Sequence, residues 1–181
     1  MSVVCIWALD PGHHSAIAQG RVWEEGSVIE RLKGVQMFES ETFEGDEIEQ
    51  MRKLHRSWQD FQFRCRKAGL PYEMVIENFT LTRIKSSERE GLSPVRVTAA
   101  FLGYRHGLAD AYNRAGFGPS RVASPIFQEP SAAMTHATDK RLKEWDLWLP
   151  GSAKEHERDA IRHFCLRVAK RAQRTYVREP S

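Results

Sequence analysis

The chain has 181 residues, of which 41% are hydrophobic and 28% charged, and its net charge is +3. This length suits one domain and lets the chain bury a core without the help of disulfides. The 12 Gly, the 8 Pro and the ordinary apolar fraction exclude collagen-like and disordered proteins, and no apolar run approaches the ~20 residues that span a membrane. The opening residues lack the pattern of a secretory signal, so we expect a soluble, intracellular protein.

The first part of the chain predicts three strands and a helix. Residues 3–10 (VVCIWALD) are a short run of β-branched and aromatic residues that ends at an Asp-Pro-Gly turn, which is typical of a strand buried on both faces. Two further strands over 16–23 and 28–36, joined at Glu-Gly-Ser, predict a β-meander. Apolar residues at spacings of three and four then predict an amphipathic helix over 46–67.

The second part alternates strands and helices. The predicted elements are a strand at 72–79, a helix at 94–114, a short strand at 121–124, a short helix at 139–147 and a last helix from 152 to about 174. Strands joined by helical crossovers lie parallel. We therefore predict an α/β fold with a mixed five-stranded sheet, in which the first three strands form an antiparallel meander and the later strands are parallel, flanked by helices.

Charge is unevenly distributed along the chain. Residues 39–49 are acidic, whereas residues 162–178 carry six basic side chains and no acidic one. Such a basic segment is typical of a solvated helix face or a flexible tail, and a surface that faces a polyanion is the alternative. Cys5, Cys65 and Cys165 are widely spaced and form no CxxC pair, so we expect buried thiols in a reducing compartment.

Two acidic residues stand at the ends of predicted strands. Asp10 closes the strand 3–10, and Glu77 follows the apolar Val75 and Ile76. The carboxyl ends of neighbouring strands in an α/β sheet form the usual ligand site. Two converging carboxylates repel each other and raise each other's pKa, and a cation between them resolves that conflict. Asp10 in an Asp-Pro-Gly turn has an alternative interpretation as a purely structural residue.

The last predicted helix adds two more candidate ligands. His156 and Asp159 are three residues apart and therefore share a helix face, whereas Glu155 and Glu157 are interpreted as ordinary acids of a first helical turn. If this face meets the strand ends, it completes a site with oxygen ligands and one nitrogen. That donor set suits Mg²⁺ or Mn²⁺ and does not suit structural zinc.

Four short motifs occur in an order that resembles one family. The sequence reads ALDPG after the first strand, VIENF at the fourth, GYRHG in the following helix and HERDA at the start of the last helix. In this order they resemble the RNase H-like nuclease superfamily, and within it the RuvC-type Holliday-junction resolvases. The GYRHG motif is similar to the Arg-Gly helix of those resolvases. The resemblance implies an RNase H-like fold, with a single nuclease domain over residues 1–175 and a tail at 176–181.

The resemblance also implies an activity. A RuvC-like enzyme is a metal-dependent endonuclease that cleaves branched DNA, here by symmetric nicking of a four-way junction to leave 5′-phosphate and 3′-hydroxyl ends. Two Mg²⁺ or Mn²⁺ ions, about 3.5–4 Å apart, would be held by Asp10, Glu77, His156 and Asp159. No organic cofactor and no membrane are implied. The compartment would be a bacterial cytoplasm, a virus-infected host cell or an organelle matrix.

Symmetric cutting implies a homodimer, because a two-fold axis supplies two equivalent sites. We expect the helix 94–114 to form the interface through Val95, Val97, Ala100, Phe101 and Tyr104. The alternative is that these residues belong to the core of one chain. The candidates for DNA contact are Phe79, Arg83, Lys85, Arg89, Arg105 and Lys154. Phe79 lies one residue closer to Glu77 than the family's stacking Phe, and residues 125–152 match no family feature.

Three other interpretations remain open at this stage. The same metal site would serve an RNase H-like nuclease that acts on flaps, forks or RNA–DNA hybrids. A non-catalytic DNA-binding relative is the second. The third is an actin-like nucleotide-phosphate-binding protein, because Asp10 to Ser15 (DPGHHS) also resembles the phosphate turn of that fold, although 181 residues cannot hold its two lobes.

Overall fold

The computed structural model describes residues 2–12, 14–78, 93–115 and 124–177. Within these ranges the elements, in chain order, are β1 (Val3–Asp10), β2 (Ser15–Trp23), α1 (Val28–Lys33), β3 (Gln36–Phe43), α2 (Glu47–Lys67), β4 (Tyr72–Glu77), α3 (Ser93–Arg114), β5 (Ile126–Gln128), α4 (Pro130–His136), α5 (Asp139–Glu144), the 3₁₀ turn η2 (Ser152–Lys154) and α6 (Glu155–Val177). In this part of the chain no helix is both long enough and apolar enough to cross a membrane.

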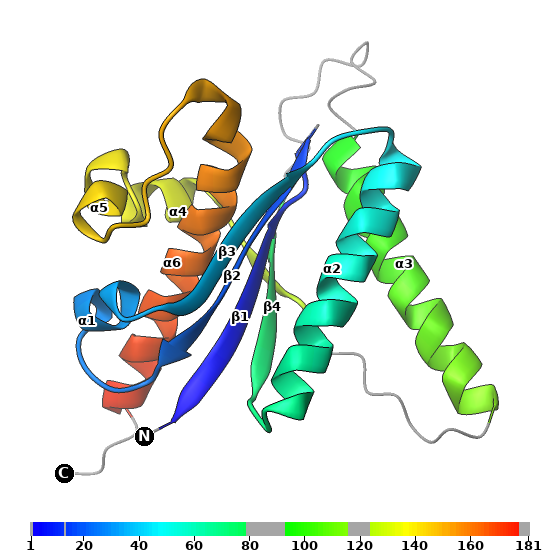
Figure 1. Ribbon diagram of the computed structural model, residues 1–181, viewed down its shortest axis with the longest axis horizontal. Helices are drawn as coiled ribbons and strands as arrows, with labels where there is room; N and C mark the ends of the chain where they lie inside the picture. The colour runs from blue at the N-terminus through cyan, green and yellow to red at the C-terminus, as the bar shows by residue number, and fades with distance from the viewer. Residues whose placement is uncertain (1, 13, 79–92, 116–123, 178–181) are drawn as a thin grey trace.

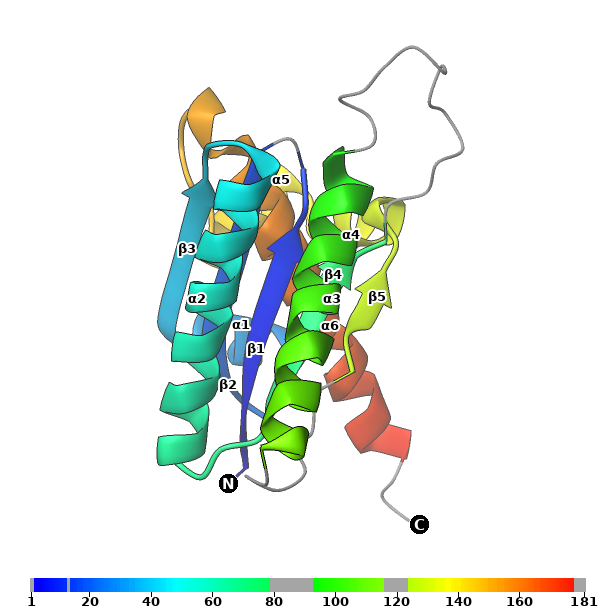
Figure 2. The same ribbon diagram turned by 90° about the vertical axis from the view of Figure 1, so that its right-hand side faces the viewer.

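The five strands form one mixed sheet in the order β3-β2-β1-β4-β5. β1 pairs antiparallel with β2, and β2 pairs antiparallel with β3. β4 lies parallel to β1, and β5 parallel to β4. Helices α2 and α3 cover one face of the sheet, and α6 with α1, α4 and α5 covers the other (Figures 1 and 2). The predicted mixed five-stranded sheet flanked by helices is thereby confirmed.

The side chains of β1 alternate between two cores. Ile6 and Ala8 belong to the core beneath α6, whereas Trp7 and Leu9 belong to the core beneath α2 and α3. Trp7 is fully buried, with its ring stacked on Phe101 and edge-on to Trp58. The strand is therefore buried on both faces, as its nearly continuous apolar run predicts.

The predicted strand over 28–36 is wrong. Residues 28–33 form helix α1, which begins at a capping box in which the Ser27 hydroxyl accepts from the Glu30 N–H and the Glu30 carboxylate accepts from the Ser27 N–H. The third strand is β3, eight residues further along, and it lies at the edge of the sheet. Its polar residues (ESET) face partly toward solvent. They belong to an acidic segment of the sequence without an apolar run, so the pattern did not predict a strand there.

The C-terminal third also differs in detail. Residues 121–123 of the strand expected at 121–124 lie outside the described residues, and β5 begins at Ile126, beyond Pro125. Helix α4 was not predicted, and α5 ends at Glu144 rather than 147. Helix α6 continues to Val177, two residues into the segment expected to be a tail. Cys5, Cys65 and Cys165 are buried free thiols, as predicted.

Two basic residues of α6, Arg167 and Arg171, turn toward the sheet, whereas Lys170 is exposed. Arg167 is buried and donates two hydrogen bonds to the Glu73 carboxylate of β4, at 2.6 and 2.7 Å. Arg171 also binds Glu73, at 2.6 Å, and pairs with Glu24, the residue that follows β2. These arginines fasten α6 to the sheet. They contribute to holding the helix in place and are not available to a polyanion.

Candidate metal centre

The sheet brings Asp10 and Glu77 to the same edge and the same face. Leu9 of β1 is in register with Ile76 of β4, so Asp10 and Glu77 are the next residues on two adjacent parallel strands. Successive side chains of a strand alternate between faces. Asp10 therefore lies on the side of Ala8, and Glu77 on the side of Val75, in the core covered by α6.

Asp10 is held from two directions. Its Oδ1 accepts a hydrogen bond from the Gly12 N–H at 3.1 Å, and its Oδ2 lies 3.4 Å from Nδ1 of His156. A Cβ at position 12 would lie 3.1 Å from the same His156 nitrogen, so the glycine permits this close approach. The Asp-Pro-Gly turn is thus a support for the carboxylate and for the ring beside it.

Burial and neighbouring charges act on the pKa of Asp10. Burial of the carboxyl group, the largest effect, raises its pKa to about 6; the His156 hydrogen bond opposes this, and the charges of Glu77 and Asp159 add to it. The hydrogen bond to Asp10 raises the pKa of His156 in return. The three carboxylates are therefore close enough to repel one another at this edge.

The first turns of α6 supply the other two candidate ligands. His156 lies over Asp10, with 36% of its side chain exposed, and Asp159 lies one turn further along the helix. Burial raises the pKa of Asp159, although the adjacent Arg162 lowers it. Arg162 forms ion pairs with both Asp159 and Asp139. The helix thus places a guanidinium, as well as the two candidates, at the margin of the site.

The donor set suits a hard divalent cation: three carboxylates and one imidazole, of which the carboxylates repel one another without a cation. The side chains are not closed around an ion, however, since no group of three or more His, Cys, Asp or Glu among the described residues has the arrangement of a metal site. The chemistry of the residues fits Mg²⁺ or Mn²⁺, and Asp159 would have to exchange its pairing with Arg162 for an ion.

One residue of this edge, His163, lies outside the motifs that the sequence offers. His163 is 1% exposed, and its Nε2 lies 3.1 Å from Oε2 of Glu77. It follows Asp159 by four residues on α6, so the same helical spacing that joins His156 to Asp159 could have identified it. Glu157 is an acid of the first turn of α6, as expected. It is also buried, and it accepts hydrogen bonds from Ser40 and Thr42 of β3.

The candidates for DNA contact fall into two groups. Phe79, Arg83, Lys85 and Arg89 lie outside the described residues. Of the others, Arg105 is only 5% exposed, with its guanidinium over the Trp58 ring and a hydrogen bond to Met74 Sδ. It is therefore part of the core and is not accessible to a phosphate. Lys154 remains half-exposed and pairs with the buried Glu157.

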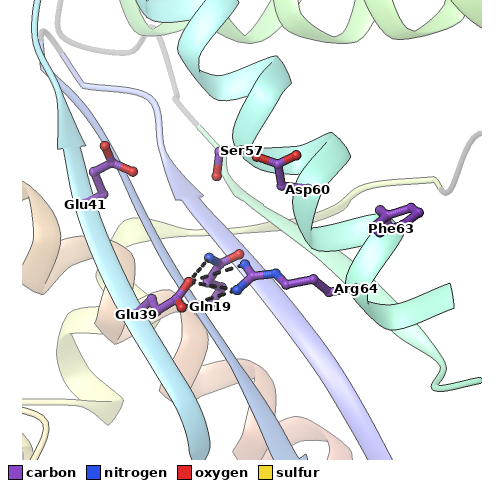
Figure 3. Close-up of a pocket in the computed structure, with 7 residues that line it drawn as sticks. All are labelled: Gln19, Glu39, Glu41, Ser57, Asp60, Phe63 and Arg64. Carbon is purple, nitrogen blue, oxygen red and sulfur yellow. Dashed lines mark hydrogen bonds and ion pairs between the residues drawn. The ribbon is translucent and has the colours of Figure 1, made fainter. Parts of the chain in front are cut away.

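A cavity of about 450 Å³ lies elsewhere, between the β2–β3 side of the sheet and helix α2 (Figure 3). Its lining includes the carboxylates of Glu39, Glu41 and Asp60, with Arg64 paired to Glu39. None of the four candidate ligands lines it. Its excess of negative charge would repel a phosphate backbone, so it does not extend the candidate site toward DNA.

The strand order, the crossovers and the final helix packed on the sheet make an α/β fold that is similar to the RNase H-like fold of RuvC. Two solved structures of Thermus thermophilus RuvC are similar to this chain. One, in complex with a Holliday junction substrate, is 14% identical with a TM-score of 0.54; the other is 15% identical with a TM-score of 0.53. Each alignment covers 95% of this chain and 96% of the other. No protein-family model and no curated protein sequence matches the chain.

Proposed function

We propose that this protein is a divalent-metal-dependent endonuclease that resolves four-way DNA junctions by symmetric nicking. The observation that supports the proposal is that Asp10 and Glu77 end adjacent parallel strands, with His156 of α6 against Asp10 and Asp159 one helical turn beyond His156. Carboxylates that converge at a largely buried strand end repel one another, and a bound cation would relieve that repulsion, so their arrangement favours a functional site. One of the similar structures contains a junction substrate, which supports branched DNA as the substrate class.

The residues of the chain would divide the chemistry as follows. Asp10, Glu77 and Asp159 would supply oxygen ligands, and His156 a nitrogen ligand. When bound, Mg²⁺ or Mn²⁺ at such a site lowers the pKa of a water and stabilises charge on the leaving 3′ oxygen. The Gly12 N–H fixes the Asp10 carboxylate at the strand end. Attack of water on phosphorus with loss of the 3′ oxygen leaves 5′-phosphate and 3′-hydroxyl ends.

The test is cleavage of labelled substrates by the purified protein. We expect paired, symmetric nicks in a four-way junction with Mg²⁺ or Mn²⁺ and none with a chelator. A flap, a replication fork and an RNA–DNA hybrid of the same sequences are incubated alongside. If one of these is cleaved faster than the junction, that nucleic acid is the preferred substrate instead. Metal binding without cleavage of the junction or of any of the other substrates would indicate a non-catalytic relative.

Two equivalent cuts require two sites, so the proposal includes a homodimer. Two residues of the expected interface, Val97 and Phe101, are fully buried in the core of the chain itself. Ala100 and Tyr104 remain exposed on α3 and could contact a second copy. Light scattering at micromolar concentration should report twice the chain mass of 20.8 kDa, and the mass of a single chain would contradict the dimer.

A further inference from the structure

His163 lies between two polar groups in the core beneath α6. Its Nε2 is 3.1 Å from Oε2 of Glu77, and its Nδ1 is 3.2 Å from Oε1 of Gln128. Gln128 stands at the end of β5, in register with Glu77, and is 2% exposed. The three side chains therefore form a row from β5, through α6, to β4. None of them but Glu77 belongs to the proposed ligand set.

The direction of these hydrogen bonds follows from the chemistry of the groups. An ionised carboxylate can only accept, so the ring nitrogen that faces Glu77 carries a proton and donates it. The Gln128 amide can meet Nδ1 with its oxygen or, turned over, with its nitrogen. The buried Nε2 of Gln128 has no partner among the described residues, and the turned orientation would give it one at Nδ1. Either orientation leaves the donor to Glu77 in place.

We propose that His163, itself oriented by Gln128, is a positioning residue that holds the Glu77 carboxylate in the orientation required for a divalent ion. This inference rests on the proposed function, because Glu77 is a ligand only if the site is a metal centre. A hydrogen bond from a buried ring to one carboxylate oxygen restricts rotation of the carboxylate. Such supporting partners raise the metal affinity of the ligands that they orient.

The position of His163 on α6 adds a second consequence. The same helix contacts Asp10 through His156 and Glu77 through His163, seven residues later. Both strand-end carboxylates are therefore contacted by side chains of the same helix. A helix held to the sheet by Arg167 and Glu73 would keep the two carboxylates at a constant separation.

The experiment compares two substitutions of His163 that separate its two hydrogen bonds. His163→Gln keeps an N–H that reaches Glu77, whereas His163→Asn keeps a polar group near Gln128 but is too short for Glu77. Gln128→Leu removes the support of the ring, and His106→Asn, at an exposed position of α3, is the matched control. The readouts are the Mn²⁺ dissociation constant, from electron paramagnetic resonance of free Mn²⁺, and the melting temperature without metal.

We expect His163→Asn to weaken Mn²⁺ binding about 10-fold or more, His163→Gln to stay within about 3-fold of the wild type, and Gln128→Leu to lie between them. The melting temperature of the metal-free Gln128→Leu and His163→Gln proteins should be close to that of the wild type. Rescue by Gln distinguishes orientation of Glu77 from a merely structural histidine.

Equal Mn²⁺ affinity of the wild type and His163→Asn would overturn the inference and leave the proposed function standing, as would a His163→Gln protein that binds as weakly as His163→Asn. If His163→Asn does not fold, unchanged affinity in Gln128→Leu overturns the inference instead. A wild type that binds no Mn²⁺ overturns both the inference and the proposed function.

Discussion

Replacing Asp10 by Asn, or Glu77 by Gln, should lower the rate of junction cleavage on the order of 1,000-fold while junction affinity stays equal or rises. Each substitution removes the charge of a proposed ligand and keeps the shape of the side chain. The loss of negative charge also reduces repulsion of the phosphate backbone, so binding does not suffer with catalysis. The measurements are single-turnover cleavage in Mg²⁺ and gel-shift affinity for the junction in the absence of metal.

Matched controls separate the role of the site from a general effect of charge. Asp60→Asn and Glu41→Gln make the same chemical changes in the acidic cavity beside α2, away from the candidate ligands. Both should leave cleavage within about 3-fold of the wild type, since isolated surface charges act weakly through solvent. If the variants at positions 10 and 77 lose folding and junction binding together, these acids are structural and the proposed function fails.

The largest effect on stability is expected at Glu73, where Glu73→Gln should lower the free energy of unfolding by about 3 kcal/mol. The substitution removes the counter-charge of Arg167, whose side chain is only 4% exposed and donates two hydrogen bonds to this carboxylate. Since Glu73 keeps 19% of its side chain exposed, we take the lower end of the cost of breaking a buried ion pair. Urea unfolding at neutral pH measures the difference.

The pH dependence of that difference has a definite sign. Burial alone would raise the pKa of Glu73, but hydrogen bonds and charges from Arg167 and Arg171 outweigh it and lower the pKa below its ordinary 4.5. A carboxylate with a lowered pKa stabilises the fold above its unfolded-state pKa, and the contribution is lost as the pH falls toward the folded-state value. The gap between wild type and Glu73→Gln should be constant from pH 6 to 8 and narrow below about pH 4.5.

Glu39→Gln is the control for this prediction. Its carboxylate pairs with Arg64, but the side chains are 51% and 36% exposed, so loss of the pair should cost no more than about 0.5 kcal/mol. If Glu73→Gln lowers the free energy of unfolding by less than about 1 kcal/mol, or if this difference from the wild type is unchanged at low pH, the ion-pair network around α6 contributes little net stability.

Local patterns in the sequence predicted the elements with one strong period. The apolar run of β1 fits only a strand, and the three-and-four spacing of α2 fits only a helix. The predicted ends of both elements lie within a few residues of the observed ones. The apolar residues of 28–36 fit a strand as well as a short helix, so their pattern alone predicts the wrong element. The capping box at Ser27 and Glu30 decides in favour of the helix, and it was the signal to use.

The candidate site was predictable where it depends on strand ends and helix spacing. Asp10 and Glu77 meet because their strands are parallel neighbours, and His156 shares a face with Asp159. Contacts between distant elements were not predictable in the same way. The buried partner of His163 on β5, and the inward turn of Arg167 and Arg171 toward Glu73, depend on how α6 packs on the sheet, which no local period encodes.

The most direct test of the metal centre is a crystal structure of the protein soaked in Mn²⁺, with the ions located by anomalous diffraction. The proposed metal centre predicts two anomalous peaks about 3.5–4 Å apart at the ends of β1 and β4, with carboxylate oxygens of Asp10, Glu77 and Asp159 at about 2.1 Å and Arg162 turned away from Asp159. Mn²⁺ bound only elsewhere, for example at Glu39 and Glu41, with this edge unchanged, would contradict it.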